Sequence, residues 1–205
     1  MAKILVLFHS WTGHAHRLAE GVAGGAREIE GCEVILKQVP EVLPEPVLER
    51  AGALETRKAF ADVPIATIDE LPDYYGFAFG TPTRFGCMSS TMRSFLDQTG
   101  RYYAEGKLIG RVGTVFCSTG SGGGSETTIL SSWTTLAHHG MLILPLGYRA
   151  QEIRDLSAAN GGSPYGASVL GNGPGKRPTQ NELGAARTQG RALAETVQKL
   201  FHDGS

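Results

Sequence analysis

Several features that would narrow the function are scarce or missing in this 205-residue sequence. The three cysteines, Cys32, Cys87 and Cys117, form no CxxC pair, which argues against a disulfide framework or a zinc knuckle and favours a reducing cytoplasm. The net charge is −1, so charge predicts neither a nucleic-acid nor a membrane partner. No apolar run approaches the ~20 residues of a membrane span. We therefore expect a soluble, cytoplasmic protein without a metal site.

Continuous apolar runs alternate with amphipathic segments along the chain. These segments predict five strands, at 3–8, 33–39, 74–79, 112–117 and 141–144, and the continuous run at 3–8 predicts burial on both faces. Apolar residues spaced by three and four predict helices over about 13–30, 88–98, 125–139 and 180–201. Ser125 is the predicted N-cap of the third of these helices.

The alternation predicts one doubly wound α/β domain over residues 1–205, with helices on both faces of a five-stranded parallel sheet. Its expected strand order is the flavodoxin-like 2-1-3-4-5. Two stretches without clear periodicity, about 40–73 and 147–180, are expected to be excursions from this core, the first with one helix.

Three unusual loops follow the first, third and fourth predicted strands. They are HSWTGH (9–14), GTPTRFG (80–86) and STGSGGG (118–124). In the order 2-1-3-4-5 the ligand site lies at the carboxyl ends of the strands, where these three loops meet. Their convergence is the strongest functional indication in the residues themselves.

The first loop has the composition of a phosphate site. It leads into a helix N-terminus, which favours an anion, and Ser10 and Thr12 add hydroxyl groups while Gly13 lets the backbone fold around a ligand. There is no lysine and no GxxxxGK[ST], so a monoester phosphate is favoured over a nucleoside triphosphate. The alternative, that Ser10 only caps the helix, stays open at this point.

The other two loops are suited to a flat ring. Pro82 stiffens the second loop, in which Thr83, Arg84 and Phe85 offer N–H groups, a cation and an aromatic edge. Residues 118–124 supply backbone with few side chains, which can lie close to a heterocycle. GxGxxG, GxSxG and the acidic residues of a phosphoacceptor domain are all absent, which leaves a mononucleotide such as a flavin.

Four motifs together resemble one known family. HSWTGH, GTPTRFG followed by MSSTMRSFLDQTG, STGSGGG and SSWTTLAHHGM are similar to the WrbA family of FMN-dependent NAD(P)H:quinone oxidoreductases. The resemblance covers essentially the whole chain. It implies a cytosolic homotetramer, a dimer of dimers, with one FMN per subunit, which reduces quinones by two electrons at the expense of NADH or NADPH.

The resemblance also implies which residues bind FMN. The phosphate loop comprises Ser10, Trp11, Thr12, Gly13, His14 and Ala15. The ring is bordered on one side by Pro82, Thr83, Arg84, Phe85 and Gly86, and along its other edge by Ser118, Thr119, Gly120, Ser121, Gly122 and Gly123. His138 matches a family position that reaches the flavin site, and His138 and Arg84 are the candidate catalytic residues.

Two positions depart from the family pattern. Thr12 stands where relatives often have a tyrosine implicated in nicotinamide-nucleotide binding, and Tyr103 stands where they have a tryptophan over the substrate pocket. Both changes alter the aromatic area above the flavin, which bears on the choice of nicotinamide nucleotide and quinone. The stretch around 54–63 also looks longer than in relatives and has no assigned role.

Without a dinucleotide fingerprint, the nicotinamide and the quinone are expected to use the same face of the flavin in turn, which predicts ping-pong kinetics. Arg84 and His138 would stabilise negative charge, with His138 as a proton donor. Simpler roles are a surface ion pair for Arg84, a helix cap for His138 and an interface contact for Tyr103.

Alternative functions are a flavodoxin-type electron carrier and an FMN-binding regulatory protein without turnover. A carrier is usually strongly acidic, unlike this chain.

Overall fold

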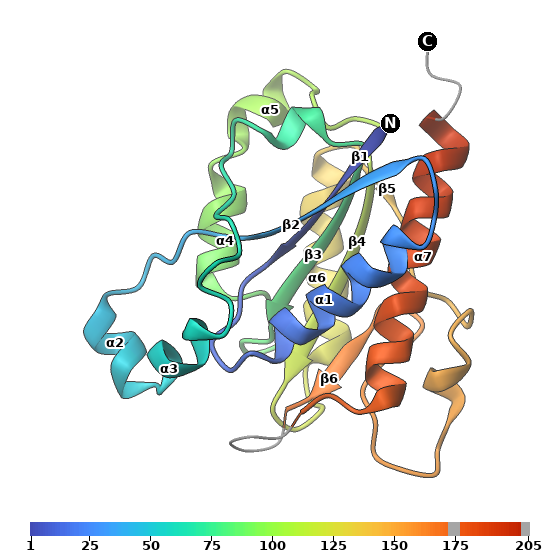
Figure 1. Ribbon diagram of the computed structural model, residues 1–205. Coiled ribbons are helices and arrows are strands. Elements are labelled where there is room, and N and C mark those ends of the chain that lie inside the picture. The colour runs from blue at the N-terminus through green and yellow to red at the C-terminus, as the bar shows by residue number, and fades with distance from the viewer. Residues whose placement is uncertain (172–176, 202–205) are drawn as a thin grey trace.

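The computed structural model describes residues 1–171 and 177–201. A parallel sheet in the order β2-β1-β3-β4-β5 lies at its centre with helices on both faces, which confirms the predicted topology (Figure 1). The strands are β1 (Ala2–Phe8), β2 (Cys32–Gln38), β3 (Gly76–Pro82), β4 (Val112–Thr119), β5 (Leu142–Ile143) and β6 (Ser168–Leu170). The helices are α1 (His14–Arg27), α2 (Glu45–Arg50), α3 (Ala53–Lys58), α4 (Ser90–Asp97), α5 (Gly100–Ala104), α6 (Ser125–His138) and α7 (Gln180–Phe201), with 3-10 turns at Leu71–Asp73 and Gln151–Arg154.

The side chains of β1 alternate between two apolar cores. Ile4, Val6 and Phe8 belong to the core that contains residues of α1 and α7. Leu5 and Leu7 belong to the core on the other face, which contains residues of α4 and α6. Because both faces are covered, every one of these positions is apolar, and such a run is what predicts a buried parallel strand.

Helices α1 and α7 lie side by side on one face of the sheet (Figure 1) and touch through their backbones. A Cβ atom added at Gly25 would lie 1.9 Å from the carbonyl oxygen of Arg187, and one added at Gly190 would lie 1.9 Å from that of Val22. Each helix therefore presents a glycine where the other helix comes closest.

The fifth strand differs from its prediction over 141–144. β5 is only two residues long and pairs with Val112 and Gly113, at the start of β4. Further along the same edge of β4, β6 pairs with residues 117–119. The excursion predicted for 147–180 thus contains a strand. This strand was not predicted because it has only three residues, lies in a glycine-rich stretch and forms through its pairing with β4. Residues 172–176 of this excursion lie outside the described part.

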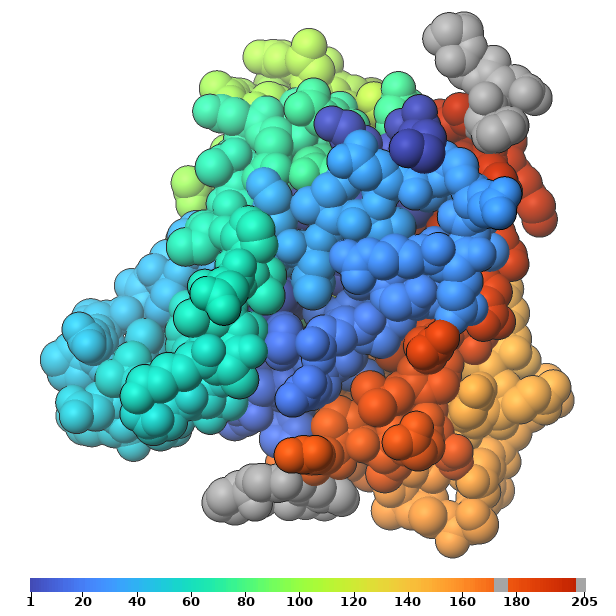
Figure 2. All heavy atoms as spheres, viewed as in Figure 1, coloured from blue at the N-terminus to red at the C-terminus, as the bar shows by residue number. Residues whose placement is uncertain are grey.

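Three further elements differ from expectation. β3 begins at Gly76 and continues to Pro82, so the first residues of GTPTRFG belong to the strand. The excursion over 40–73 carries two short helices, α2 and α3, which project from the body of the molecule (Figure 2). α5 was not predicted, because five residues are too few to show a helical period.

Within the described ranges, no helix has both the length and the apolarity that crossing a membrane requires.

Candidate functional site

The loop after β1 carries a buried hydroxyl group with no partner. Gly13 ends this loop at φ +79° and is the N-cap of α1, without any side-chain cap. Ser10 is 2% exposed, and across the residues described its Oγ atom has no hydrogen-bond partner. Ser10 therefore does not cap the helix, which removes the simpler interpretation of this residue. An unsatisfied buried hydroxyl costs about 1–3 kcal/mol, so this group favours a hydrogen-bonding partner from outside the chain.

A single carboxylate holds this loop against its neighbours. Glu41, in the segment after β2, accepts hydrogen bonds from Trp11 Nε1 and His9 Nε2, each at 3.2 Å. It also accepts one from Thr91 Oγ1 at 3.0 Å and one from Arg57 Nη1 at 3.2 Å. Glu41 thereby links the first loop to α3 and to the first turn of α4. No motif marks it, and its role was not predicted.

Electrostatics keep Glu41 ionised and His9 neutral. Burial alone would raise the pKa of Glu41, but hydrogen bonds from His9, the Leu43 amide and Thr91 outweigh it and lower that pKa to about 2. Burial lowers the pKa of His9 below its usual value of 6.5, against the opposing effect of Glu41. A neutral His9 donates from Nε2 to Glu41 and accepts at Nδ1 from the Ser89 hydroxyl, 2.8 Å away.

The second loop places a cation beside the first. The Arg84 guanidinium lies 4.9 Å from the centre of the Trp11 ring, and its Nη1 donates to the Thr83 carbonyl at 2.8 Å. Partial burial lowers the pKa of Arg84 from its ordinary value, but a guanidinium keeps its charge at neutral pH. Phe85 has a φ of 52° and a fully exposed ring, a backbone conformation that non-glycine residues rarely adopt.

The third loop is held by its own threonine. Thr119 Oγ1 accepts from the Gly122 amide at 3.1 Å and donates to the Gly123 carbonyl at 3.2 Å. Gly124, at φ +81°, is the N-cap of α6. Ser125 was predicted to be this cap but is the first residue of the helix, and its hydroxyl donates to the Gly122 carbonyl at 3.1 Å. The glycine reaches a left-handed conformation that turns the chain into the helix without a side-chain cap.

The three loops enclose a cavity of about 160 Å³ at the carboxyl edge of the sheet, which we call the loop cavity. Among the residues described, its lining contains one arginine and no carboxylate, and comprises Trp11, Thr12, His14, Pro82, Thr83, Arg84, Ser118, Thr119, Gly120 and Gly171. Nine of these ten residues were predicted from the sequence. Gly171 was not, because it follows the unpredicted strand β6.

The other predicted residues of these loops have different positions. Ser10, Gly13, Ala15, Phe85, Gly86, Ser121, Gly122 and Gly123 lie on the same loops or the first turn of α1, outside the lining of the loop cavity. Thr12 Oγ1 lies 2.7 Å from His14 Nδ1, which fixes two lining side chains relative to each other. A Cβ atom at Gly171 would lie 2.9 Å from the same His14 nitrogen, so the backbone after β6 closes tightly on α1.

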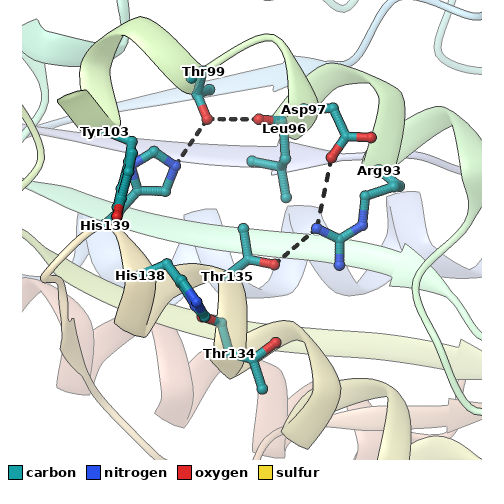
Figure 3. Close-up of a pocket in the computed structure, with 10 residues that line it drawn as sticks. Arg93, Leu96, Asp97, Thr99, Tyr103, Thr134, Thr135, His138 and His139 are labelled. Carbon is teal, nitrogen blue, oxygen red and sulfur yellow. Dashed lines mark hydrogen bonds and ion pairs between the residues drawn. The ribbon is translucent and has the colours of Figure 1, made fainter.

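His138 and Tyr103 lie in a separate cavity of about 340 Å³, between the end of α6 and helices α4 and α5 (Figure 3). His138 is the last residue of α6, and the 14-residue helix places it about 20 Å from the third loop. Its Nδ1 donates to the Thr134 carbonyl at 2.7 Å. Within one chain, therefore, the structure does not bring His138 and Tyr103 to the loop cavity.

The neighbouring histidine in this cavity is held more firmly. The Thr99 hydroxyl donates its hydrogen to the Leu96 carbonyl, so it accepts from His139 Nε2, 2.8 Å away (Figure 3). Burial lowers the pKa of His139, with a smaller effect of His138 in the same direction. Arg93 donates to Thr135 Oγ1 at 2.9 Å on the opposite side of the cavity. His138 is thus the more exposed of the two histidines.

A comparison with protein families gives a direct match. The profile of a family described as NADPH-dependent FMN reductase covers residues 2–152, from the start of β1 through α6 and β5. The chain belongs to the NADPH-dependent FMN reductase family. Membership indicates a flavoprotein oxidoreductase and supports FMN binding.

Solved structures confirm the fold. A flavodoxin, WrbA-like protein from Agrobacterium tumefaciens superposes with a TM-score of 0.67 and 22% identity, over 97% of this chain and 99% of that one. A flavodoxin from the domain Archaea gives 0.61 and 20%, over 96% and 99%. A flavone reductase gives 0.60 and 13%, over 98% of this chain and 64% of that one. At such identities the likeness concerns the fold alone.

Proposed function

We propose that this protein is an FMN-dependent NAD(P)H:quinone oxidoreductase of the WrbA type that reduces quinones by two electrons. The observation that carries the proposal is the loop cavity with the unpartnered Ser10 hydroxyl beside it. Neutral donors and one arginine, in place of lysines and acidic metal ligands, suit a monophosphate and a polar ring. The family match is independent support for the flavin.

The residues present fit FMN. Ser10 Oγ and the N-terminal amides of α1 would hold the phosphate, since that hydroxyl otherwise remains unsatisfied. Thr83, Arg84 and the backbone at Gly120 would border the ring, because they line the cavity from the second and third loops. A bound FMN would supply the two-electron hydride chemistry between NAD(P)H and the quinone.

Arg84 supplies the positive charge of the loop cavity. Trp11 and the Thr83 carbonyl fix its guanidinium, and Trp11 is itself fixed by Glu41. A cation held in this way stabilises negative charge on the ring or on a quinol oxygen without having to reorganise. Thr12 lines the same cavity and would contact the nicotinamide nucleotide. NAD(P)H and quinone would share the loop cavity and bind in turn, which gives ping-pong kinetics.

The proposal extends to a homotetramer, arranged as a dimer of dimers. His138 and Tyr103 are too far from the loop cavity of their own chain, so they can act on a flavin only from another subunit. Exposed apolar side chains near them support a buried interface: Tyr103, Ile109 and Leu142 are 58%, 68% and 49% exposed. In the assembly, His138 would supply the proton and Tyr103 would cover the quinone.

The three free cysteines support a cytoplasmic location.

The test is the absorbance at 340 nm of FMN-loaded protein with NADH or NADPH, with and without benzoquinone. We expect sustained, quinone-dependent oxidation well above a free-FMN control, and its loss in Arg84→Ala and His138→Ala. If FMN binds but oxidation stays at the control rate, the oxidoreductase proposal is wrong. An electron carrier, detected by single-electron transfer to a protein acceptor, or a regulatory FMN-binding protein would then replace it.

A further inference from the structure

A third cavity, of about 190 Å³, lies on the other side of the first turn of α1, and we call it the α3 pocket. Three separate segments form it: the first turn of α1, helix α3 with the residues that follow it, and the residues just before α7. The stretch around 54–63, for which the sequence suggested no role, therefore builds one wall. Figure 2 shows that this stretch, with α2, forms a lobe projecting from the body of the molecule.

The floor of the α3 pocket is aromatic and uncharged. Phe60 is 3% exposed, and its ring centre lies 4.7 Å from that of His16 in a tilted contact. Burial lowers the pKa of His16 despite the opposing effect of Glu20, so the imidazole is neutral at pH 7. Phe60 also packs edge-on against Phe8, which keeps it in place. A rigid aromatic floor of this kind is suited to a heterocyclic ring.

The mouth of the pocket is cationic. Arg17 and Arg177 both line it and both are exposed, and no carboxylate lies among its lining residues in the described part of the chain. Glu20 pairs with Arg17 at 3.0 Å from outside the pocket, where solvent screens the pair. The amino end of α1 adds positive potential. Two guanidinium groups above an aromatic floor are a recognition pattern for a phosphorylated nucleoside.

The α3 pocket adjoins the loop cavity. Thr12 and His14 line both, so an elongated ligand held in the α3 pocket can reach a flavin bound in the loop cavity. A dinucleotide is such a ligand, because it carries a reactive ring at one end and a purine at the other. NADPH differs from NADH only by a phosphate on the purine ribose, the group that a pair of arginines would recognise.

We propose that the α3 pocket binds the adenosine 2′-phosphate end of NADPH, with the purine against Phe60 and His16 and the phosphate between Arg17 and Arg177. This inference rests on the proposed function and makes these two arginines the residues that determine nucleotide preference. FMN's own phosphate belongs at Ser10, on the loop-cavity side.

Calorimetric titration of the FMN-loaded protein tests the pocket without turnover. The probes are adenosine 2′,5′-bisphosphate and adenosine 5′-monophosphate, which differ by the 2′-phosphate. We expect the bisphosphate to bind at least tenfold more tightly, and Arg17→Ala and Arg177→Ala each to remove most of that difference. Arg50→Ala is the matched control, since Arg50 is an exposed arginine of the same excursion outside the pocket, and it should behave as wild type.

Kinetics give a second measurement, in which the two arginine variants should raise KM for NADPH much more than KM for NADH. Equal affinity for the two nucleotides, or a double Arg17→Ala/Arg177→Ala variant that binds the bisphosphate as wild type does, would overturn the inference. So would a loss of FMN affinity in these variants with riboflavin affinity unchanged, because the pocket would then serve the FMN phosphate. If neither nucleotide is oxidised with quinone, the proposed function fails. The calorimetric titration still tests whether the α3 pocket binds the 2′-phosphate.

Discussion

Two adjacent glycines of α1 differ in what lies above them, and this difference predicts opposite effects of the same substitution. A Cβ atom at Gly25 would lie 1.9 Å from the Arg187 carbonyl oxygen of α7, whereas one at Gly24 would have nothing within 4 Å. Ordinary contact begins at 3.4 Å, so Gly25→Ala must move the two helices apart by about 1.5 Å. Gly24→Ala moves nothing.

The magnitudes follow from two competing effects. Alanine in place of glycine stabilises a helix interior by up to about 1 kcal/mol, and both variants receive this gain. Forcing an extra carbon into a packed contact costs about 1–3 kcal/mol, occasionally more, and only Gly25→Ala bears this cost. The shared gain cancels, so we expect the free energy of unfolding to differ by about 1–3 kcal/mol between the two variants, with Gly24→Ala the more stable. For a chain of this length that is about 2–12 °C in Tm.

Urea unfolding followed by circular dichroism, without added FMN, measures this difference directly. Gly190→Ala approaches the same contact from α7, where its Cβ would lie 1.9 Å from the Val22 carbonyl oxygen, and it should resemble Gly25→Ala. If Gly25→Ala is as stable as Gly24→Ala, the backbones of α1 and α7 do not meet as described, and the reasoning is refuted.

Three further predictions concern the site. Ser10→Ala should weaken FMN binding about tenfold or more in a fluorescence titration and leave riboflavin affinity unchanged, because its hydroxyl is assigned to the phosphate; an equal loss for both flavins would contradict that assignment. Glu41, with its pKa lowered to about 2, stabilises the fold above its ordinary pKa of 4.5 and loses this effect as the pH falls. Between pH 6 and pH 3 the wild type should therefore lose about 2 kcal/mol of unfolding free energy more than Glu41→Gln, and equal losses would show that Glu41 is not held as described. Arg84→Lys keeps the charge but loses the planar contact with Trp11, so steady-state kinetics should show a lower kcat with benzoquinone; an unchanged kcat would mean that the stacked geometry is not required.

The sequence predicts the central strands well because β1, β3 and β4 are buried along most of their length. The run Ile4–Phe8 is apolar without interruption, and Val112–Cys117 contains only Thr114 as a polar side chain, so each is recognised without knowledge of its neighbours. The same reasoning fails for β6, whose residues Ser168–Leu170 become a strand only through pairing with β4. Elements stabilised by distant partners leave no local period to detect.

The residues of the candidate site were predicted or missed for the same reason. Residues of the loops at 9–14, 80–86 and 118–124 were predicted because the carboxyl edge of such a sheet is fixed by topology. Glu41 was missed because it is a single acidic residue among prolines, and it acquires its role from contacts with Trp11 and Thr91 across the fold. Gly171 was missed along with β6. The separation of His138 from the loop cavity follows from the direction of α6, which begins at the third loop and ends far from it.

The divided fifth strand has a consequence for how this fold can diversify. β5 ends at Ile143 opposite Gly113, and β6 begins at Ser168 opposite Cys117, so both ends of the intervening segment are anchored on the same strand. Gly113 and Cys117 are four positions apart on β4, about 13 Å. Within the intervening segment, Leu146, Ala150 and Ala167 belong to the core, whereas residues 154–159 are exposed. The exposed part can therefore change in length and composition over generations while the sheet and its carboxyl edge stay the same.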